Sequence, residues 1–268
     1  MGKLDGRVAI VTGATRGVGR SVALALAREG AAVVLAAKTV DPNPKLPGTL
    51  ASVKAEVEAL GARALTVQTD VRDPAQIERM VAEAGRAFGR VDILVNNAGA
   101  AWWHPIEETP ANKYNLVMEV NARAPFLASR EALPFMRRQK WGHIVNMSPP
   151  VHPEKGGQRV AYMMSKFGMT LLTHGLAAEL QGENIAVHSL WPVTLIESYA
   201  TINLGLGEPA QWRKAEILAD ATIALVTREP SVSSGKAWLD EEILAECGVK
   251  DFAGYACVPG TEPMRIPW

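Results

Sequence analysis

The sequence predicts an α/β fold: a single doubly wound (Rossmann-type) domain with a parallel sheet of about seven strands and helices on both faces. An apolar, β-branched run at residues 8–12 leads into a glycine-rich turn and then into a helix-patterned stretch at 20–29. Short apolar runs then alternate with stretches of helical length along the chain, which is typical of a parallel sheet covered on both faces. The chain has 268 residues, of which 48% are hydrophobic, enough for one large core. We therefore expect residues 1–268 to form one domain.

The glycine-rich turn is the first candidate site, and it comprises Gly13, Ala14, Thr15, Arg16, Gly17, Val18 and Gly19. A strand–turn–helix unit directs free backbone N–H groups and a helix N-terminus at an anionic ligand, usually a pyrophosphate. Glycines let the backbone turn sharply and approach the phosphate oxygens without a Cβ in the way. The glycine spacing differs from the tighter G-x-G-x-x-G pattern, so the alternative is a tight connection that binds nothing.

The second predicted strand, at 32–37, indicates which nucleotide this site prefers. NAD-binding folds often end this strand with an acid that holds the ribose 2′-OH. Here the strand ends in Ala37 and Lys38 instead. Lys38 and Arg16 can pair with a 2′-phosphate, which a carboxylate would repel. The pattern favours NADP (NADPH) over NAD, and the alternative is that Lys38 is only a solvated charge.

The other predicted elements continue the alternation. Further strands are predicted at 64–67, 91–95, 142–147, 185–190 and 236–240, and helices at 50–60, 74–88, 111–138, 161–180 and 210–227. A proline-rich loop spans 39–48, and the tail 241–268 is expected to be irregular, with an apolar end that packs on the fold. Parallel sheets bind ligands beyond the carboxyl ends of their strands, where Lys38, Asp70 and Asn97 are expected.

A tyrosine and a lysine spaced for one helix face are the candidate chemical groups. Tyr162 and Lys166 stand four residues apart, so they share one face of the predicted helix. A phenol titrates near ~10 in water and is a poor base at neutral pH. A neighbouring ammonium favours the phenolate and makes the tyrosine useful for exchanging a proton with an alcohol or carbonyl. The spacing alone is weak, and the alternative is a tyrosine that only packs its ring.

The order of these motifs along the chain is far more specific than any one of them. The ordered set is Thr12-Gly13-x-x-x-Gly17-x-Gly19, Asp70-Val71, Asn96-Asn97-Ala98-Gly99, mid-helix Asn121, strand-tip Ser148 and Tyr162-x-x-x-Lys166. Over nearly its whole length the chain resembles the short-chain dehydrogenase/reductase family. Within the family it is most similar to the hydroxysteroid dehydrogenase-like protein 2 group and its bacterial relatives, some described as citronellol/citronellal dehydrogenases. The narrower likeness rests on Ala36-Ala37-Lys38-Thr39, Asn146-Met147-Ser148-Pro149-Pro150 and Leu190-Trp191-Pro192.

The resemblance implies catalytic roles for four residues. Tyr162 would be the general acid/base, and Lys166 would lower its pKa and bind the nicotinamide ribose. Ser148 would hydrogen-bond the substrate oxygen. Asn121 would hold a proton-relay water, and its alternative role is to brace the long helix.

The resemblance also implies where the cofactor contacts the chain. Residues 13–19 would hold the pyrophosphate, with Arg16 and Lys38 near the 2′-phosphate and Asp70 at the adenine. The remaining cofactor-binding residues would be Val71, Asn97, Ala98, Gly99, Tyr162, Lys166, Pro192 and Thr194. Animal members of the narrower group carry an added sterol-carrier domain, and none is expected within this chain.

Three departures from the family pattern concern the loop on the nicotinamide side and the subunit contact at the last strand. The segment from Ser148 to Tyr162 is slightly stretched, and Val193 replaces the glycine that usually follows Pro192. The last strand ends in Asp240 and Glu241, where a glycine pair is common.

Composition excludes several classes of partner. The formal net charge is +0 with no basic stripe, so neither nucleic acid nor an anionic membrane is expected as a partner. No apolar run is long enough to span a bilayer, and residues 1–6 lack the apolar region that a signal peptide needs. Cys247 and Cys257 lie outside any metal-ligand spacing, so no metal is expected and both thiols are expected to be reduced in a cytoplasmic protein. The family resemblance implies a homodimer or homotetramer built on the long helices.

The substrate pocket is expected to be apolar. Its predicted residues are Trp102, Trp103, His104, Val151, His152, Trp191, Leu195, Ile196, Tyr199, Ile202, Leu204 and Leu206. Few polar anchors among apolar side chains favour a terpenoid, long-chain or sterol-like alcohol, aldehyde or ketone as substrate. The alternative is that these residues pack against each other or a second subunit.

The sequence thus predicts an NADP(H)-dependent oxidoreductase acting on an alcohol/carbonyl pair. One rival is an NADP(H)-binding regulatory or scaffold protein of the same fold with little turnover, which would need none of the four catalytic residues. The other is a nucleotide-sugar epimerase or dehydratase, for which the chain is short.

Overall fold

The computed structural model describes residues 2–43, 46–150, 152, 154 and 157–266. Its centre is a seven-stranded sheet of order β3-β2-β1-β4-β5-β6-β9, in which every neighbouring pair is parallel. The strands are β1 Val8–Thr12, β2 Ala32–Ala37, β3 Ala64–Gln68, β4 Ile93–Asn96, β5 Gly142–Asn146, β6 Ile185–Trp191 and β9 Lys236–Leu239. The predicted fold class is confirmed, because the chain winds outwards from β1 in both directions.

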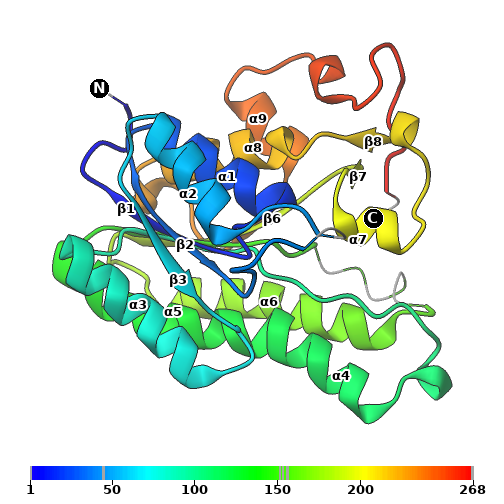
Figure 1. Ribbon diagram of the computed structural model, residues 1–268, viewed down its shortest axis with the longest axis horizontal. Helices are drawn as coiled ribbons and strands as arrows, with labels where there is room; N and C mark the ends of the chain where they lie inside the picture. The colour runs from blue at the N-terminus through cyan, green and yellow to red at the C-terminus, as the bar shows by residue number, and fades with distance from the viewer. Residues whose placement is uncertain (1, 44–45, 151, 153, 155–156, 267–268) are drawn as a thin grey trace.

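Helices cover both faces of the sheet (Figure 1). One layer packs α1 against α2 and α8, and α8 against α9. This layer consists of α1 Gly17–Arg28, α2 Leu50–Ala59, α8 Glu216–Val226 and α9 Asp240–Glu246. The opposite layer consists of α3 Pro74–Phe88, α4 Ala111–Met118, α5 Ala124–Gln139 and α6 Val160–Glu179.

Alternate residues of each central strand enter opposite cores because successive side chains of a strand point to opposite faces. In β1, Ala9 and Val11 pack under the α1–α8 layer, and Val8 and Ile10 pack under the α3–α6 layer. All four are at most 1% exposed, so the strand reads as a continuous apolar run rather than as an alternation.

The long helix predicted at 111–138 is interrupted at its centre. The π-helical segment Glu119–Arg123 joins α4 to α5 and contains Asn121. A π-bulge inserts an extra residue into the helical turn and is frequent at functional sites. The interruption is only five residues long and has helix on both sides, which is why the sequence pattern suggests one helix.

The predictions for 210–227 and 241–268 are corrected in part. Trp212–Arg213 is a short strand, β8, that pairs with β7 Leu195–Ile196, and α8 begins only at Glu216. A short helix, α7 Tyr199–Asn203, lies between these strands in the chain. The start of the tail is helical, because three acids in the first turn of α9 favour a helix N-terminus.

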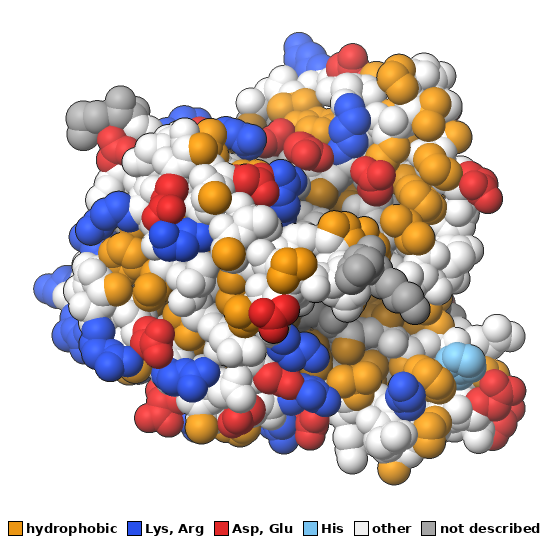
Figure 2. Space-filling model, viewed as in Figure 1, with side chains coloured by type: hydrophobic (Ala, Val, Ile, Leu, Met, Phe, Trp, Pro, Cys, Tyr) orange, Lys and Arg blue, Asp and Glu red, His pale blue; other side chains and the backbone are white. Residues whose placement is uncertain are grey.

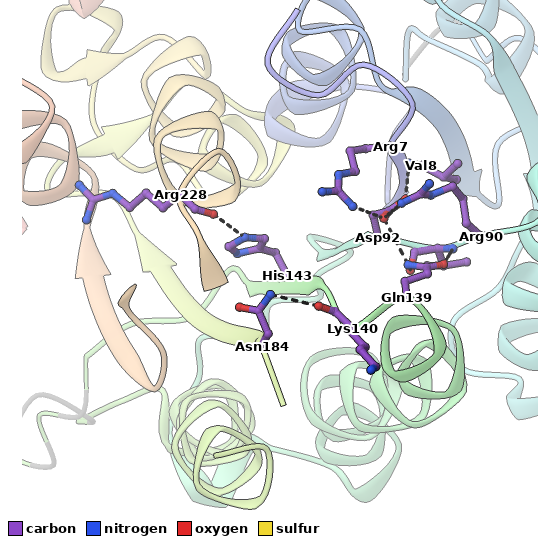
Figure 3. A network of polar contacts seen from close by, with 10 residues as sticks. Arg7, Val8, Arg90, Asp92, Gln139, Lys140, His143, Asn184 and Arg228 are labelled. Atoms are coloured by element: carbon purple, nitrogen blue, oxygen red, sulfur yellow. Dashed lines mark hydrogen bonds and ion pairs between the residues drawn. The ribbon is translucent and has the colours of Figure 1, made fainter. Parts of the chain in front are cut away.

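Asp92, at the entry to β4, fastens three elements together (Figure 3). Its carboxylate is fully buried and accepts from the backbone N of Val8 at 2.9 Å. It also accepts from Arg7 at 3.1 Å, Arg90 at 2.6 Å and Gln139 at 3.2 Å. Two cationic partners and a backbone donor compensate the cost of burying this charge.

A pair of buried histidines lies between β5 and β6. His143 Nε2 donates to the carbonyl of Arg228 at 3.0 Å, so its Nδ1 is the acceptor for His188 Nε2 at 3.3 Å (Figure 3 shows the first contact). This order of donors leaves both rings neutral. Burial lowers the pKa of both histidines below the usual value near 6.5.

We expect the free energy of unfolding to fall as the pH is lowered from about 7 to about 5. The unfolded chain protonates His143 and His188 below their usual pKa, whereas the folded chain keeps them neutral. Each group then costs at most about 1.4 kcal/mol per pH unit. Asp240 opposes this trend, because burial raises its pKa to about 6. As the pH falls, the folded chain therefore binds up to one more proton at Asp240 than the unfolded chain does. Urea unfolding at both pH values measures the slope.

A variant isolates the histidine contribution. His188→Leu should remove one titrating group and reduce the pH dependence relative to wild type. Equal slopes for His188→Leu and wild type would contradict the assignment.

Candidate active site

A cleft of about 690 Å³ opens beyond the carboxyl ends of the strands. The glycine-rich turn, α6 and the segment from β6 to α7 form its walls. The residues that line it include Gly17, Val18, Gly19, Asn97, Gly99, Trp103, Tyr162, Lys166, Pro192, Thr194, Leu204 and Met264. Figure 2 shows hydrophobic side chains gathered over the part of the molecule that carries α7 and β8.

The turn between β1 and α1 is built to bring backbone close to a ligand. Gly13 has a φ of +68°, and a Cβ at Gly19 would lie 2.3 Å from the carbonyl oxygen of Gly13. No side chain caps the start of α1, and its first turn holds no acid. The N–H groups at this end of α1 therefore face the cleft in the manner of an anion site, and the turn fits a pyrophosphate.

Thr12 and Asn97 hold this turn in place, and the sequence reasoning assigned Thr12 no role. Asn97 Nδ2 donates to the carbonyl of Thr12 at 2.8 Å. Thr12 Oγ1 accepts from the backbone N of Asn97 and of Ala98, each at 3.0 Å. A polar residue at the end of a fully apolar strand was the available signal. Ala14 and Thr15 are buried in the turn and lie outside the cleft lining.

Arg16 and Lys38 lie at the tip of β2. Arg16 lines the cleft and donates to Thr39 Oγ1 at 2.9 Å and to the carbonyls of Pro47 and Gly48. It thus fastens the proline-rich loop over the end of β2. Lys38 is exposed beside it and outside the cleft lining.

Asp70 lies at the end of β3, also outside the cleft lining. Hydrogen bonds from Arg72 lower its pKa to about 2, and the charge of Lys38 adds to this effect. The carboxylate therefore stays ionised and engaged with Arg72 at 2.6 Å. Val71 packs against the α3–α6 core.

Tyr162 and Lys166 lie one turn apart on α6, and both line the cleft. The expected lowering of the Tyr162 pKa by Lys166 is not found: burial raises this pKa above its usual value, and the charge that opposes the rise is that of Arg159. Burial lowers the pKa of Lys166 to about 8. Lys166 Nζ donates to the carbonyl of Met147 at 2.7 Å, and the Tyr162 ring packs against Trp103 with centroids 5.8 Å apart. Because its pKa is raised from a value near 10, the phenol is protonated at neutral pH.

Asn121 is fully buried and uses its side chain to brace the site. Its Nδ2 donates to the carbonyl of Ala100 at 2.8 Å and to Ser165 Oγ at 2.9 Å, and its Oδ1 accepts from the backbone N of Ala100. These contacts tie the loop after β4 to α6. Ser165, three residues after Tyr162, was missed by the sequence reasoning.

Ser148 is brought near α6 but does not line the cleft. It is fully buried, and its Oγ donates to Ser189 Oγ at 2.9 Å. Ser189 in turn donates to Thr173, which also accepts from Asn146. The hydroxyl thus belongs to a buried polar chain, an arrangement that sequence spacing does not reveal.

Pro192 and Thr194 line the cleft. Val193, between them, donates its backbone N to Asp240 Oδ1 at 3.0 Å. Val193 and Asp240 are two of the departures from the family pattern, and this hydrogen bond joins them. The acid that follows β9 thereby anchors the loop after β6.

The expected apolar wall is present in most of its parts. Trp103, Trp191, Leu195, Ile196, Tyr199, Leu204 and Leu206 line the cleft as predicted. Trp102 and His104 stack on each other instead, and Ile202 is half exposed. His152 lies on the surface near Glu154, and Val151 lies outside the described residues.

The charge of the cleft is positive. Arg16, Arg159 and Lys166 line it, and no described lining residue is Asp or Glu. Arg159, three residues before Tyr162, was missed although the helical spacing places it near that face. In the described ranges no helix is long and apolar enough to cross a membrane. Those ranges also hold no cluster of three or more His, Cys, Asp or Glu suited to a metal ion.

Known proteins resemble this chain in sequence and in structure. Hydroxysteroid dehydrogenase-like protein 2 from Bos taurus is 43% identical over 262 residues, which cover 97% of this chain and 62% of that protein. A short chain dehydrogenase from Mycobacterium thermoresistibile has a TM-score of 0.92 and 38% identity, over 99% of this chain and 95% of that one. A metagenomic short-chain oxidoreductase in complex with NADP has a TM-score of 0.75 and 30% identity, over 88% of this chain and 97% of that one.

The matches also differ in how much of each protein they cover. The chain spans less than two thirds of the length of the bovine relative, at 62%. The sequence pattern of the family described as short chain dehydrogenase matches residues 7–201, which hold the glycine-rich turn, Asn121 and the Tyr162–Lys166 pair. With this match and a sheet that has the same fold, the chain belongs to the short-chain dehydrogenase family of oxidoreductases.

Proposed function

We propose that this protein is an NADP(H)-dependent oxidoreductase that interconverts an alcohol and a carbonyl on an apolar substrate. One observation carries the proposal: the backbone of the glycine-rich turn, the Tyr162–Lys166 pair and an apolar wall line one continuous cleft. A nicotinamide cofactor held there would supply or accept the hydride. The chain must then orient the substrate and move one proton.

Tyr162 is the proposed general acid/base. Its raised pKa keeps the phenol protonated at neutral pH, which is the form that gives a proton to a carbonyl oxygen during reduction. The ammonium of Lys166 on the next turn would stabilise the phenolate that remains. Arg159 adds a second positive charge on the same side.

Ser148 and Asn121 are proposed to support this proton transfer. The Ser148 hydroxyl, which now donates to Ser189, is proposed to donate to a substrate oxygen instead. Asn121 holds Ser165 through its Nδ2 and Ala100 through its Oδ1. The Oδ1 atom can accept a second hydrogen bond, which is suited to a relay water.

NADP is the proposed cofactor, because the tip of β2 offers cations and no acid. Arg16 already lies across the end of β2, and Lys38 stands exposed beside it. The metagenomic relative in complex with NADP supports this choice. The pyrophosphate would lie on Gly17–Gly19, and the nicotinamide would lie toward Pro192 and Thr194.

Lys38→Glu is expected to reduce the preference for NADPH over NADH by roughly 10- to 100-fold, because it replaces a charge-assisted contact to the 2′-phosphate with repulsion. Fluorescence titration with both nucleotides gives the ratio of dissociation constants. Lys250→Glu makes the same charge change at an exposed site in the tail and should leave the ratio unaltered. An unaltered ratio in Lys38→Glu would remove Lys38 from the site.

The test of the proposed function is NADPH consumption with a panel of apolar aldehydes and ketones. Turnover with terpenoid, long-chain or sterol-like compounds would support it. Tight NADPH binding without turnover across the panel would favour a regulatory or scaffold protein instead.

We propose a cytoplasmic homodimer or homotetramer as the assembled form. Phe126 on α5 and Met164 and Leu171 on α6 are large apolar side chains that are 48–64% exposed. A second copy of the long-helix layer would cover them.

A further inference from the structure

The two acids that follow β9, at the start of α9, tie together three segments around the cleft. Asp240 accepts from the backbone N of Val193, in the loop after β6, at 3.0 Å. Glu241 pairs with Arg213 of β8 at 2.5 Å and with Arg265 of the tail at 2.8 Å. The family pattern often has glycines here, which could make none of these side-chain contacts.

The Arg213–Glu241 pair is the buried part of this arrangement. The two side chains are only 8% and 16% exposed, whereas that of Arg265 is 62% exposed. Breaking a buried pair leaves an uncompensated charge, so the contact of Glu241 with Arg213 is more costly to lose than its exposed contact with Arg265. Glu241 is therefore a fixed point to which the more exposed tail attaches.

The tail places alternate side chains on opposite sides. The Met264 backbone N donates to the carbonyl of Gln211 at 3.2 Å, and that of Ile266 donates to the carbonyl of Val193 at 2.8 Å. Thr194 and Arg265 pair as an antiparallel bridge between these bonds. In such an extended segment neighbouring side chains point apart. Arg265 thus reaches Glu241, while Met264 and Ile266 line the cleft.

We propose that Met264 and Ile266 form the wall that limits substrate size, and that Glu241 is the positioning residue that holds this wall. The inference rests on the proposed function and names its substrate class as an unbranched or terpenoid aliphatic chain. Leu204 and Leu206 also line the cleft and add apolar surface for such a substrate.

The wall predicts a chain-length limit that Met264→Ala should extend. Affinity for straight-chain primary alcohols should rise about fourfold per methylene until the chain reaches the wall, and then level off. Replacing Met264 by alanine opens space for about two or three more methylenes, so the plateau should move to longer alcohols by that number. Tryptophan fluorescence of the full chain, titrated with hexan-1-ol to dodecan-1-ol, measures this, since Trp103 and Trp191 line the cleft.

The control for this variant is Ile202→Ala. Ile202 is 50% exposed, close to the 46% of Met264, and lies on α7 without lining the cleft. Its plateau should coincide with that of wild type. A plateau that Met264→Ala leaves in place would overturn the inference, as would equal shifts in both variants.

Glu241→Gln tests the positioning role. Releasing the tail should raise KM for long aldehydes several-fold, with kcat and the NADPH dissociation constant unchanged and with short aldehydes little affected. Glu241→Asp should restore part of the long-chain KM. Glu242→Gln, which breaks a surface pair with Lys236, is the matched control and should match wild type. An equal loss for short and long aldehydes would reject the role.

Failure of the inference and failure of the proposed function give different results. If the protein turns over aldehydes but Met264→Ala leaves the chain-length limit unchanged, only the inference about the wall is contradicted. If Met264→Ala extends the chain-length limit for alcohol binding but the protein turns over no aldehyde, the wall is supported and the proposed oxidoreductase activity is contradicted. Binding of no alcohol at all contradicts both the wall and the apolar substrate.

Discussion

Replacing Tyr162 with phenylalanine is expected to reduce turnover roughly 10²- to 10⁴-fold, the range that one positioned general acid/base contributes. The change removes only the hydroxyl, and the ring keeps its packing against Trp103. The backbone cradle at Gly17–Gly19 and the cations at β2 are remote from that hydroxyl, so the dissociation constant for NADPH should stay within a few-fold of wild type.

Single-turnover NADPH oxidation with the best aldehyde of the panel, beside a fluorescence titration with NADPH, separates chemistry from binding. Tyr114→Phe, at an exposed tyrosine of α4, is the control for removal of a hydroxyl and should behave as wild type. Retained turnover in Tyr162→Phe would remove Tyr162 from the mechanism. A joint loss of turnover and NADPH binding would assign it a structural role.

The second large effect is on stability. Asp92→Ala is expected to lower the free energy of unfolding by about 3 kcal/mol, the lower end of the range for breaking a buried ion pair. The lower end applies because the side chains of Arg7 and Arg90 are 29% and 36% exposed, so water partly compensates their lost partner. The backbone N–H of Val8 loses its acceptor inside the core, which is itself worth about 1–3 kcal/mol.

Urea unfolding measures this change, with an unaltered m-value as the sign that only stability moved. Asp92→Asn keeps an oxygen for Val8 and should lose less than Asp92→Ala. Asp41→Ala, at an exposed aspartate of the proline-rich loop, should change stability by no more than about 0.5 kcal/mol. If Asp92→Ala is as stable as Asp41→Ala, the network in Figure 3 does not hold β1, β4 and α5 together.

Most of the fold could be predicted from the sequence because its determinants are local. The β1 run and the turn that follows it are contiguous, and each later strand and helix has its own apolar period. The same holds for Tyr162 and Lys166, whose shared face follows from helical spacing alone. Local patterns failed where the structure is short or irregular. The π-helical segment around Asn121, the two-residue strand β8 and the helix α9 lack the length to give a clear period.

The candidate site also has features that local sequence predicts and features that it does not. The sequence by itself determined a parallel sheet whose strand ends carry a glycine-rich turn, a β2 tip without an acid and a tyrosine–lysine pair. Only the tertiary structure decided that Ser148 joins a buried hydroxyl chain, that Asn121 braces Ala100, and that Met264 lines the cleft. These are contacts between segments far apart in the chain. They depend on where packing places each backbone and on which partner each polar group then finds, and no local pattern of residues encodes that.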